Sequence, residues 1–139
     1  MRLVPIVEQL KASGFSRVQG VLELIALKGA PPILPAIFVM PGGESAGKNR
    51  LSGGAHHQPA EWDFGVVIML EGRVNQDRTS DELDELEGKV IQALTGWVHP
   101  DAGGQSCDYA GARLLTLAGQ TISWLVKFKT GRTIRKVPT

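Results

Sequence analysis

The residues whose types and spacing could best do chemistry form a glycine-rich stretch that ends in lysine. Gly42 to Lys48 fits the pattern GxxxxGK, which in nucleotide-binding proteins wraps backbone amides around phosphates. That chemistry also needs a Ser or Thr after the lysine to hold magnesium, and a helix whose dipole faces the phosphates. Asn49 stands where the hydroxyl is needed, and the Gly, His and Pro that follow cannot form a stable helix. A small nucleotide-binding enzyme therefore stays only as the last alternative.

Two other groups of residues could bind a metal or act as a nucleophile. His56 and His57 are adjacent, so their side chains point apart, and no carboxylate or third histidine lies at ligand spacing. Cys107 and His99 could pair as nucleophile and base, but their segment offers neither a helix start nor a glycine elbow to position a thiolate. With a single cysteine, no intrachain disulfide is expected either. The sequence predicts no catalytic residue, no metal, no cofactor and no enzyme activity.

The remaining candidates are residues that could contact a partner. A basic cluster on the last strand and tail could touch phosphates or an acidic partner, or could serve only as a solubilising edge, and the sequence leaves both open. Trp62 follows the glycine-rich stretch and could anchor a partner, whereas Trp97 and Trp124 fit the core. The candidate interface residues are Lys48, Arg50, Trp62, Lys127, Lys129, Arg132 and Arg135, with Lys136 completing the basic cluster.

The elements that must position these residues follow from apolar periodicity. Residues 2–13 repeat apolar side chains at helical spacing, with Gly14 placed to end a helix. Residues 33–40 predict a strand in which Pro35 belongs at an edge or bulge. Residues 63–71 are almost continuously apolar, which indicates a central strand covered on both faces. Residues 18–27 are ambiguous between strand and helix.

The later half of the chain predicts a helix followed by a hairpin. Thr79 to Glu82 reads as a capping box that starts a helix over 80–95. The acidic side chains near its start fit a solvated face beside the positive end of the helix dipole, and they are Asp81, Asp84, Glu85 and Glu87. Residues 113–118 and 121–130 flank Gly119-Gln120, a pair suited to a two-residue hairpin turn.

Length and composition set the frame for these elements. With 139 residues and 42% hydrophobic residues, we expect one domain over 1–139, with a long flexible loop at about 41–61. The expected fold is α+β, a mostly antiparallel sheet of about four strands flanked by an N-terminal helix and the 80–95 helix. A net charge of +1 gives no global attraction to nucleic acid or membranes. The longest apolar run is far shorter than the roughly 20 residues that span a bilayer, so no membrane partner is expected.

The order of these elements resembles a known family. An N-terminal helix and a variable piece precede Leu34 to Pro41, a glycine-rich loop ending near Gln58, and the central strand Phe64 to Leu70. The acidic-start helix, Ala93 to Trp97 and a closing hairpin with Trp124 follow. Over nearly its whole length this pattern resembles the tail terminator proteins of long-tailed bacteriophages. It consists of core and turn residues and contains no chemical signature.

The resemblance implies a structural virion protein at the head-tail junction, assembled in the cytoplasm of the bacterial host. Such proteins form a sixfold ring on the head-proximal end of the tail tube, stop its growth and offer the surface to which the head attaches. The implied partners are further copies in a hexamer, the tail tube protein, a head completion or connector protein, and, non-specifically, the DNA that passes through the lumen. Another head-to-tail connector or a tail-tube protein is the alternative.

Overall fold

The sheet organises the protein. The computed structural model describes residues 1–20, 34–51, 54–72, 76–118 and 120–136. Along the chain the elements are α1 (Val4–Ala12), β1 (Val18–Gly20), β2 (Ala36–Ala46), β3 (His56–Glu71), α3 (Gln76–Leu94), β4 (Asp108–Ala118) and β5 (Thr121–Lys136). The strand order is β1-β2-β3-β5-β4, and every neighbouring pair is antiparallel except β1 with β2. The predicted α+β class is confirmed, with five described strands where about four were expected.

Strand β3 is the centre of the sheet, as its apolar run predicted. It pairs with β5 along its whole length and with β2 from Ala60 to Met69. Val66 and Ile68 are fully buried on the face toward the helices, and Val67, on the other face, is 2% exposed. Alternate residues of a strand point to opposite faces, so this burial requires cover on both sides of the centre of β3.

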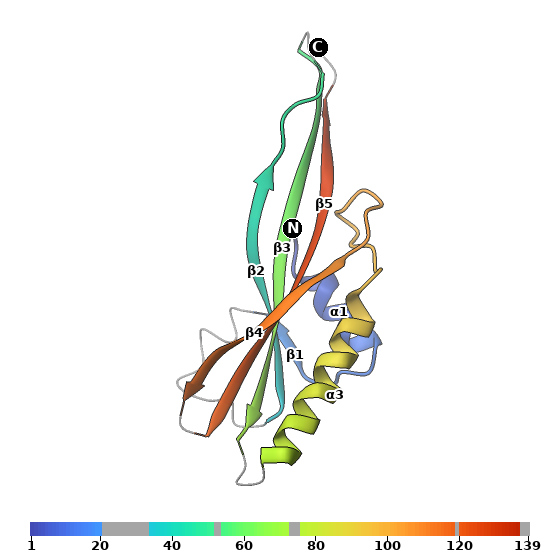
Figure 1. Ribbon diagram of the computed structural model, residues 1–139. Helices are drawn as coiled ribbons and strands as arrows, with labels where there is room; N and C mark the ends of the chain where they lie inside the picture. The colour runs from blue at the N-terminus through green and yellow to red at the C-terminus, as the bar shows by residue number, and fades with distance from the viewer. Residues whose placement is uncertain (21–33, 52–53, 73–75, 119, 137–139) are drawn as a thin grey trace.

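Helices α1 and α3 pack on one face of the sheet (Figure 1). Ile6 and Leu10 of α1 and Val90 and Leu94 of α3 are fully buried in the main core cluster. On β5, the indole Nε1 of Trp124 donates to Glu87 of α3 at 2.8 Å, which adds a polar tie between helix and sheet.

Helix α3 begins earlier than predicted. It starts at Gln76, so Thr79 lies within the first turn and is buried, and the capping box expected there is wrong. No Gly or Pro separates Gln76 from Thr79, so nothing in the backbone chemistry stops the helix from extending toward its N-terminus. None of the described helices is both long and apolar enough to span a bilayer.

Three strands run on beyond the rest of the sheet and form a projecting arm (Figure 1). Among the described residues, β1 pairs with β2 only as far as Val39, and β4 pairs with β5 only as far as Lys129. Beyond these points β3 still pairs with β5 out to Lys136 and with β2 out to Ala46. We call residues 44–51, 54–61 and 130–136 the arm, and the other described residues the body.

The arm corrects the predicted loop at about 41–61. Residues 41–46 and 56–61 are strand, which leaves only 47–55 as the connection between β2 and β3. Two of the glycines that suggested a loop instead allow close approach of neighbouring residues: a Cβ on Gly42 would lie 2.6 Å from the Asp63 carbonyl oxygen, and one on Gly47 would lie 2.7 Å from Cγ of Pro59. A high glycine content alone does not distinguish a loop from strands that approach each other closely.

Other boundaries move by a few residues. β2 begins at Ala36, so Pro35 precedes the strand, and Ile33 lies outside the described residues. Of the ambiguous 18–27 piece, Val18–Gly20 is strand and the remainder lies outside the described residues. The closing hairpin is longer than predicted at both open ends, and its turn residue Gly119 also falls outside the described part.

Candidate functional site

The base of the arm is fastened by a polar cluster that spans its three strands. Glu44 of β2 accepts hydrogen bonds from the indole Nε1 of Trp62 on β3 and, at 3.2 Å, from Nη2 of Arg132 on β5. The Arg132 guanidinium also lies 5.0 Å from the centre of the Trp62 ring, a cation-π distance. The indole hydrogen bond, and then Arg132, lower the pKa of the Glu44 carboxyl. We call Glu44, Trp62 and Arg132 the root cluster.

Trp62 is a packing residue of this root cluster. Only 3% of its surface is exposed, and its ring contacts His99 edge-on with 6.1 Å between ring centres. Such burial contradicts the expectation that Trp62 is available to anchor a partner. The sequence placed it beside a loop, whereas it stands in a strand paired on both sides, where a large indole side chain is most readily covered.

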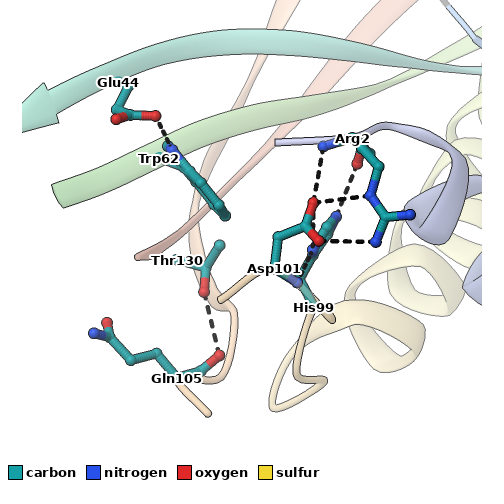
Figure 2. Close-up of polar contacts among 7 residues, drawn as sticks. All are labelled: Arg2, Glu44, Trp62, His99, Asp101, Gln105 and Thr130. Atoms are coloured by element: carbon teal, nitrogen blue, oxygen red, sulfur yellow. Dashed lines mark hydrogen bonds and ion pairs between the residues drawn. The ribbon is translucent and has the colours of Figure 1, made fainter. Parts of the chain in front are cut away.

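A second polar group ties the N-terminus to the segment after α3 (Figure 2). Arg2 forms a paired contact with Asp101, Nη2 to Oδ1 at 2.8 Å and Nε to Oδ2 at 3.1 Å. His99 accepts from the Asp101 amide at Nδ1, at 2.9 Å, so its Nε2 is assigned the proton and donates to the Arg2 carbonyl at 2.8 Å. The Arg2 hydrogen bond lowers the pKa of Asp101 to about 2. We call Arg2, His99 and Asp101 the clamp.

The contacts of the clamp prevent Cys107 and His99 from acting as nucleophile and base. His99 is fully buried, and both of its ring nitrogens are engaged, so neither is available to accept a proton from Cys107. Cys107 is itself buried in the core, and burial raises its pKa to about 11. A thiol with so high a pKa is protonated near neutrality and is a poor nucleophile.

The GxxxxGK segment is built into the arm. Gly42–Ala46 belongs to β2, and the Gly47 amide donates to the Pro59 carbonyl at 2.7 Å, an interaction along β3. Asn49 then organises the turn: its Oδ1 accepts from the amides of Leu51 at 3.2 Å and His57 at 2.9 Å. The structure thus uses these groups for strand pairing and for a turn, and no helix follows the motif. This role of Asn49 was not predicted from the sequence, although asparagine is a common turn residue.

The basic residues predicted as one cluster are divided among three places. Arg132 belongs to the root cluster. Lys127 and Lys129 lie on the face of the sheet away from the helices, because the alternating residues Val126 and Phe128 are in the core beneath the helices. The others gather at the far end of the arm with the cations of the β2–β3 connection. These tip cations are Lys48, Arg50, Arg135 and Lys136.

The sheet face around Lys127 is hollowed by small residues. Lys127 lies in register between Gly65 of β3 and Gly111 of β4. Together with Asp63 and Gly42 it lines a groove of about 340 Å³. Next along β5, Lys129 stands in register between Asp63 and Asp108, so each cation of this face has a different setting.

The two adjacent histidines stand near the tip. His56 and His57 lie opposite Lys136 and Arg135 in β5, and successive strand residues face opposite sides. Within the described part of the chain, no three His, Cys, Asp or Glu residues come together as a metal site would require. Beside two cations, these histidines belong to the basic tip.

Comparison with known proteins gives a family and a set of structural neighbours. A search of curated protein sequences found no match. A chain in the solved "Virion of native gene transfer agent (GTA) particle" is 15% identical, with 89% of this chain and 84% of that chain covered. Its TM-score of 0.47 is too low to support any argument from that likeness.

The family comparison covers the whole sequence. The family described as "Phage tail terminator protein" matches residues 1–139, which include the body, the arm, the root cluster and the clamp. That extent agrees with the order of core and turn residues described above. The protein therefore belongs to the phage tail terminator family and is a structural protein of the phage virion tail.

Proposed function

We propose that the protein closes into a ring on the head-proximal end of the tail tube, ends tube polymerisation and provides the surface to which the head attaches. The observation that carries this proposal is the family match over residues 1–139. Its role is structural: Cys107 and His99, which could have paired as nucleophile and base, are buried, and both ring nitrogens of His99 are engaged elsewhere.

The arm supports a role in assembly. From Met40 onward the outer edge of β2, and from Thr130 onward the outer edge of β5, have no strand partner among the described residues. Exposed strand edges favour contact with another chain, because their backbone donors and acceptors are unsatisfied by the sheet itself. A projecting element of this kind can reach a neighbouring subunit that the body alone would not touch.

The proposed mechanism is ring closure by heterologous contacts, in which one surface of each subunit meets a different surface of the next. A ring built this way has two unlike faces. One face fits the last ring of tube subunits, and the other, being unlike the tube, does not accept another tube subunit. The partners in this proposal are six copies of the chain, the tube protein and a head completion or connector protein.

The proposed contact residues are the exposed cations on the sheet face and in the arm. Lys127 and Lys129 serve the sheet face, and the arm contributes at its tip and root. The DNA that passes through such a ring would meet any of these cations that face the lumen, without sequence preference, because phosphate contacts carry none. The arm residues proposed for contact are Lys48, Arg50, Arg132 and Arg135.

A tube-growth assay tests the proposed function. Purified tube protein is allowed to polymerise with and without this chain, and tube lengths are measured by negative-stain electron microscopy. We expect added chain to halt elongation and leave a ring at one end of each tube. Tubes that keep growing at the same rate would refute the capping role. If the chain by itself forms long tubes, it is a tube subunit and not a terminator.

A further inference from the structure

The charge of this nearly neutral protein is separated along its length. The arm holds five Lys or Arg residues and two carboxylates, Glu44 at its root and Glu61, which gives it a net charge of +3. Helix α3 holds six acidic and two basic residues, a net charge of −4. The whole chain carries only +1, so the positive charge of the arm and the negative charge of α3 nearly cancel in the sum while lying on different elements.

The two charged elements lie at opposite ends of the molecule. The arm projects from one end of the sheet, and α3 runs along the body with its acidic first turns at the other end (Figure 1). A single chain therefore cannot bring its own tip cations to its own helix. Two copies placed head to tail can do so.

The tip cations have no partner of their own. The ion pairs within the described residues involve other cations, namely Arg2, Lys89 and Arg132. The root cluster already satisfies Glu44, the nearest carboxylate of β2, so it is not free to pair with the tip. Lys48 and Arg50 are exposed, as is Arg135, and their positive charge is therefore available to another molecule.

The exposed side of α3 has the complementary properties. Asp81, Asp84 and Glu85 are exposed, and their spacing of three and four residues places them on one side of the helix. Glu85 has one ion pair, with Lys89 at 3.3 Å, whereas no ion pair is seen for Asp81 or Asp84 among the described residues. The buried side of the helix faces the core, so these carboxylates form its outward surface.

We propose that the arm tip of one copy docks on the outward acidic side of α3 of the next copy. This inference rests on the proposed ring and supplies its subunit contact. The contact is heterologous, since a basic end meets an acidic side. When it is repeated, the rotation between successive subunits decides whether they form a closed ring or an open filament. The occupant of the arm surface is thus a second copy of this chain, selected by charge complementarity.

Charge reversal tests the contact. The arm variant carries Lys48→Glu, Arg50→Glu and Arg135→Glu, and the helix variant carries Asp81→Lys, Asp84→Lys and Glu85→Lys. A control variant, Lys11→Glu with Arg17→Glu and Arg113→Glu, makes the same charge change at exposed positions outside both surfaces. Sedimentation velocity and native mass measure the oligomer at low salt, and circular dichroism checks that each variant is folded.

The expected results follow from complementarity. Wild type and control form the closed oligomer. For each variant changed on one surface only, the protein concentration at which half of the chains are assembled rises at least tenfold. Mixing the arm variant with the helix variant restores a closed ring of alternating subunits, because the acidic arm of one variant meets the basic helix of the other and the two unchanged surfaces also meet each other. Combining all six substitutions in one chain also restores a closed ring, since reversed charges again face each other. Raising salt weakens the wild-type oligomer, because exposed charges beyond about 10 Å are screened at 0.1 M salt.

Several outcomes would overturn this inference. One is an arm variant that assembles like the control. Another is a chain with all six substitutions that is folded but stays dissociated. A third is a wild type that remains monomeric at low salt. If the arm variant assembles normally but loses binding to duplex DNA in a filter assay, the tip serves nucleic acid instead. If the contact is refuted but wild type still stops tube growth, the capping role stands. A failure of capping is detected in the tube-growth assay, whatever the oligomeric state.

Discussion

The body and the arm are parts of one sheet, yet different forces hold them together. In the body, apolar residues cover both faces of β3 and pack beneath α1 and α3, as the stacked rings of Phe64 and Phe128 show, 5.5 Å apart. None of the described helices covers the arm, which depends on strand hydrogen bonds, the root cluster and the Asn49 turn. The comparison suggests that stability resides in the body, and that the arm is a contact element which the body positions.

Removing a core ring should have the largest effect. Phe128 is fully buried, stacks on Phe64 and meets Tyr109 edge-on. We expect Phe128→Ala to lower the free energy of unfolding by about 3–5 kcal/mol, through lost burial and the cavity left behind. Urea unfolding followed by tryptophan fluorescence measures the change.

A matched substitution in the arm gives the contrast. Ile134 pairs opposite Gln58 and is 37% exposed, so Ile134→Ala removes much less buried surface. Its unfolding free energy should stay within about 1 kcal/mol of wild type. Equal losses in the two variants would mean that the arm is as much a part of the folding core as the body.

The same contrast explains what could be predicted from the sequence. The helix at the N-terminus, α3 and the central strand each bury one or both faces, and burial leaves a periodic apolar pattern. The arm strands bury little, so Ala46, Pro59 and their neighbours carried no such pattern and were interpreted as a loop. Strand pairing between residues as distant as His56 and Lys136 is set by the register of the whole sheet, which a local window does not contain.

The sequence named candidate contact residues, but it did not predict how they are arranged. The basic residues of β5 were recognised, but sequence proximity hid that Lys127 and Arg135 lie in different parts of the molecule, beside a groove and at a tip. Trp62 was misassigned because its cover comes from residues remote in sequence, Arg132 and His99. Side-chain environments made by three strands are not encoded in the spacing along any one of them.

The root of the arm should give an intermediate effect that is local. Trp62→Phe removes the indole hydrogen bond to Glu44 and weakens the contact with Arg132. We expect a loss of about 1–2 kcal/mol, the scale of one hydrogen bond together with a reduced cation-π contact. Hydrogen exchange should accelerate at amides of residues 56–61 and 130–136, with amides of Val66 and Val126 little changed.

The control at the root is Trp97→Phe, which alters a partly buried indole next to His99 and outside the arm. It should leave exchange in residues 130–136 at the wild-type rate. If both variants accelerate the arm equally, or neither does, the root cluster is not what fastens the arm to the body.

Lowering the pH should have the smallest effect on the free energy of unfolding, and it should weaken the Arg2–Asp101 contact before it disturbs the apolar core. The folded-state pKa of Asp101 is about 2, below its ordinary value of 3.8, because Arg2 donates hydrogen bonds to the carboxylate. A lowered folded-state pKa means that the clamp contributes its full stability above about pH 4 and loses it as the pH falls toward 2. Asp101→Asn should therefore be less stable than wild type at pH 6 and nearly equal to it at pH 2, as measured by urea unfolding at a series of pH values. A stability difference between the two proteins that is the same at pH 6 and pH 2 would show that the Asp101 charge does not hold the N-terminus, and that the polar ties of this protein resist acid as its core does.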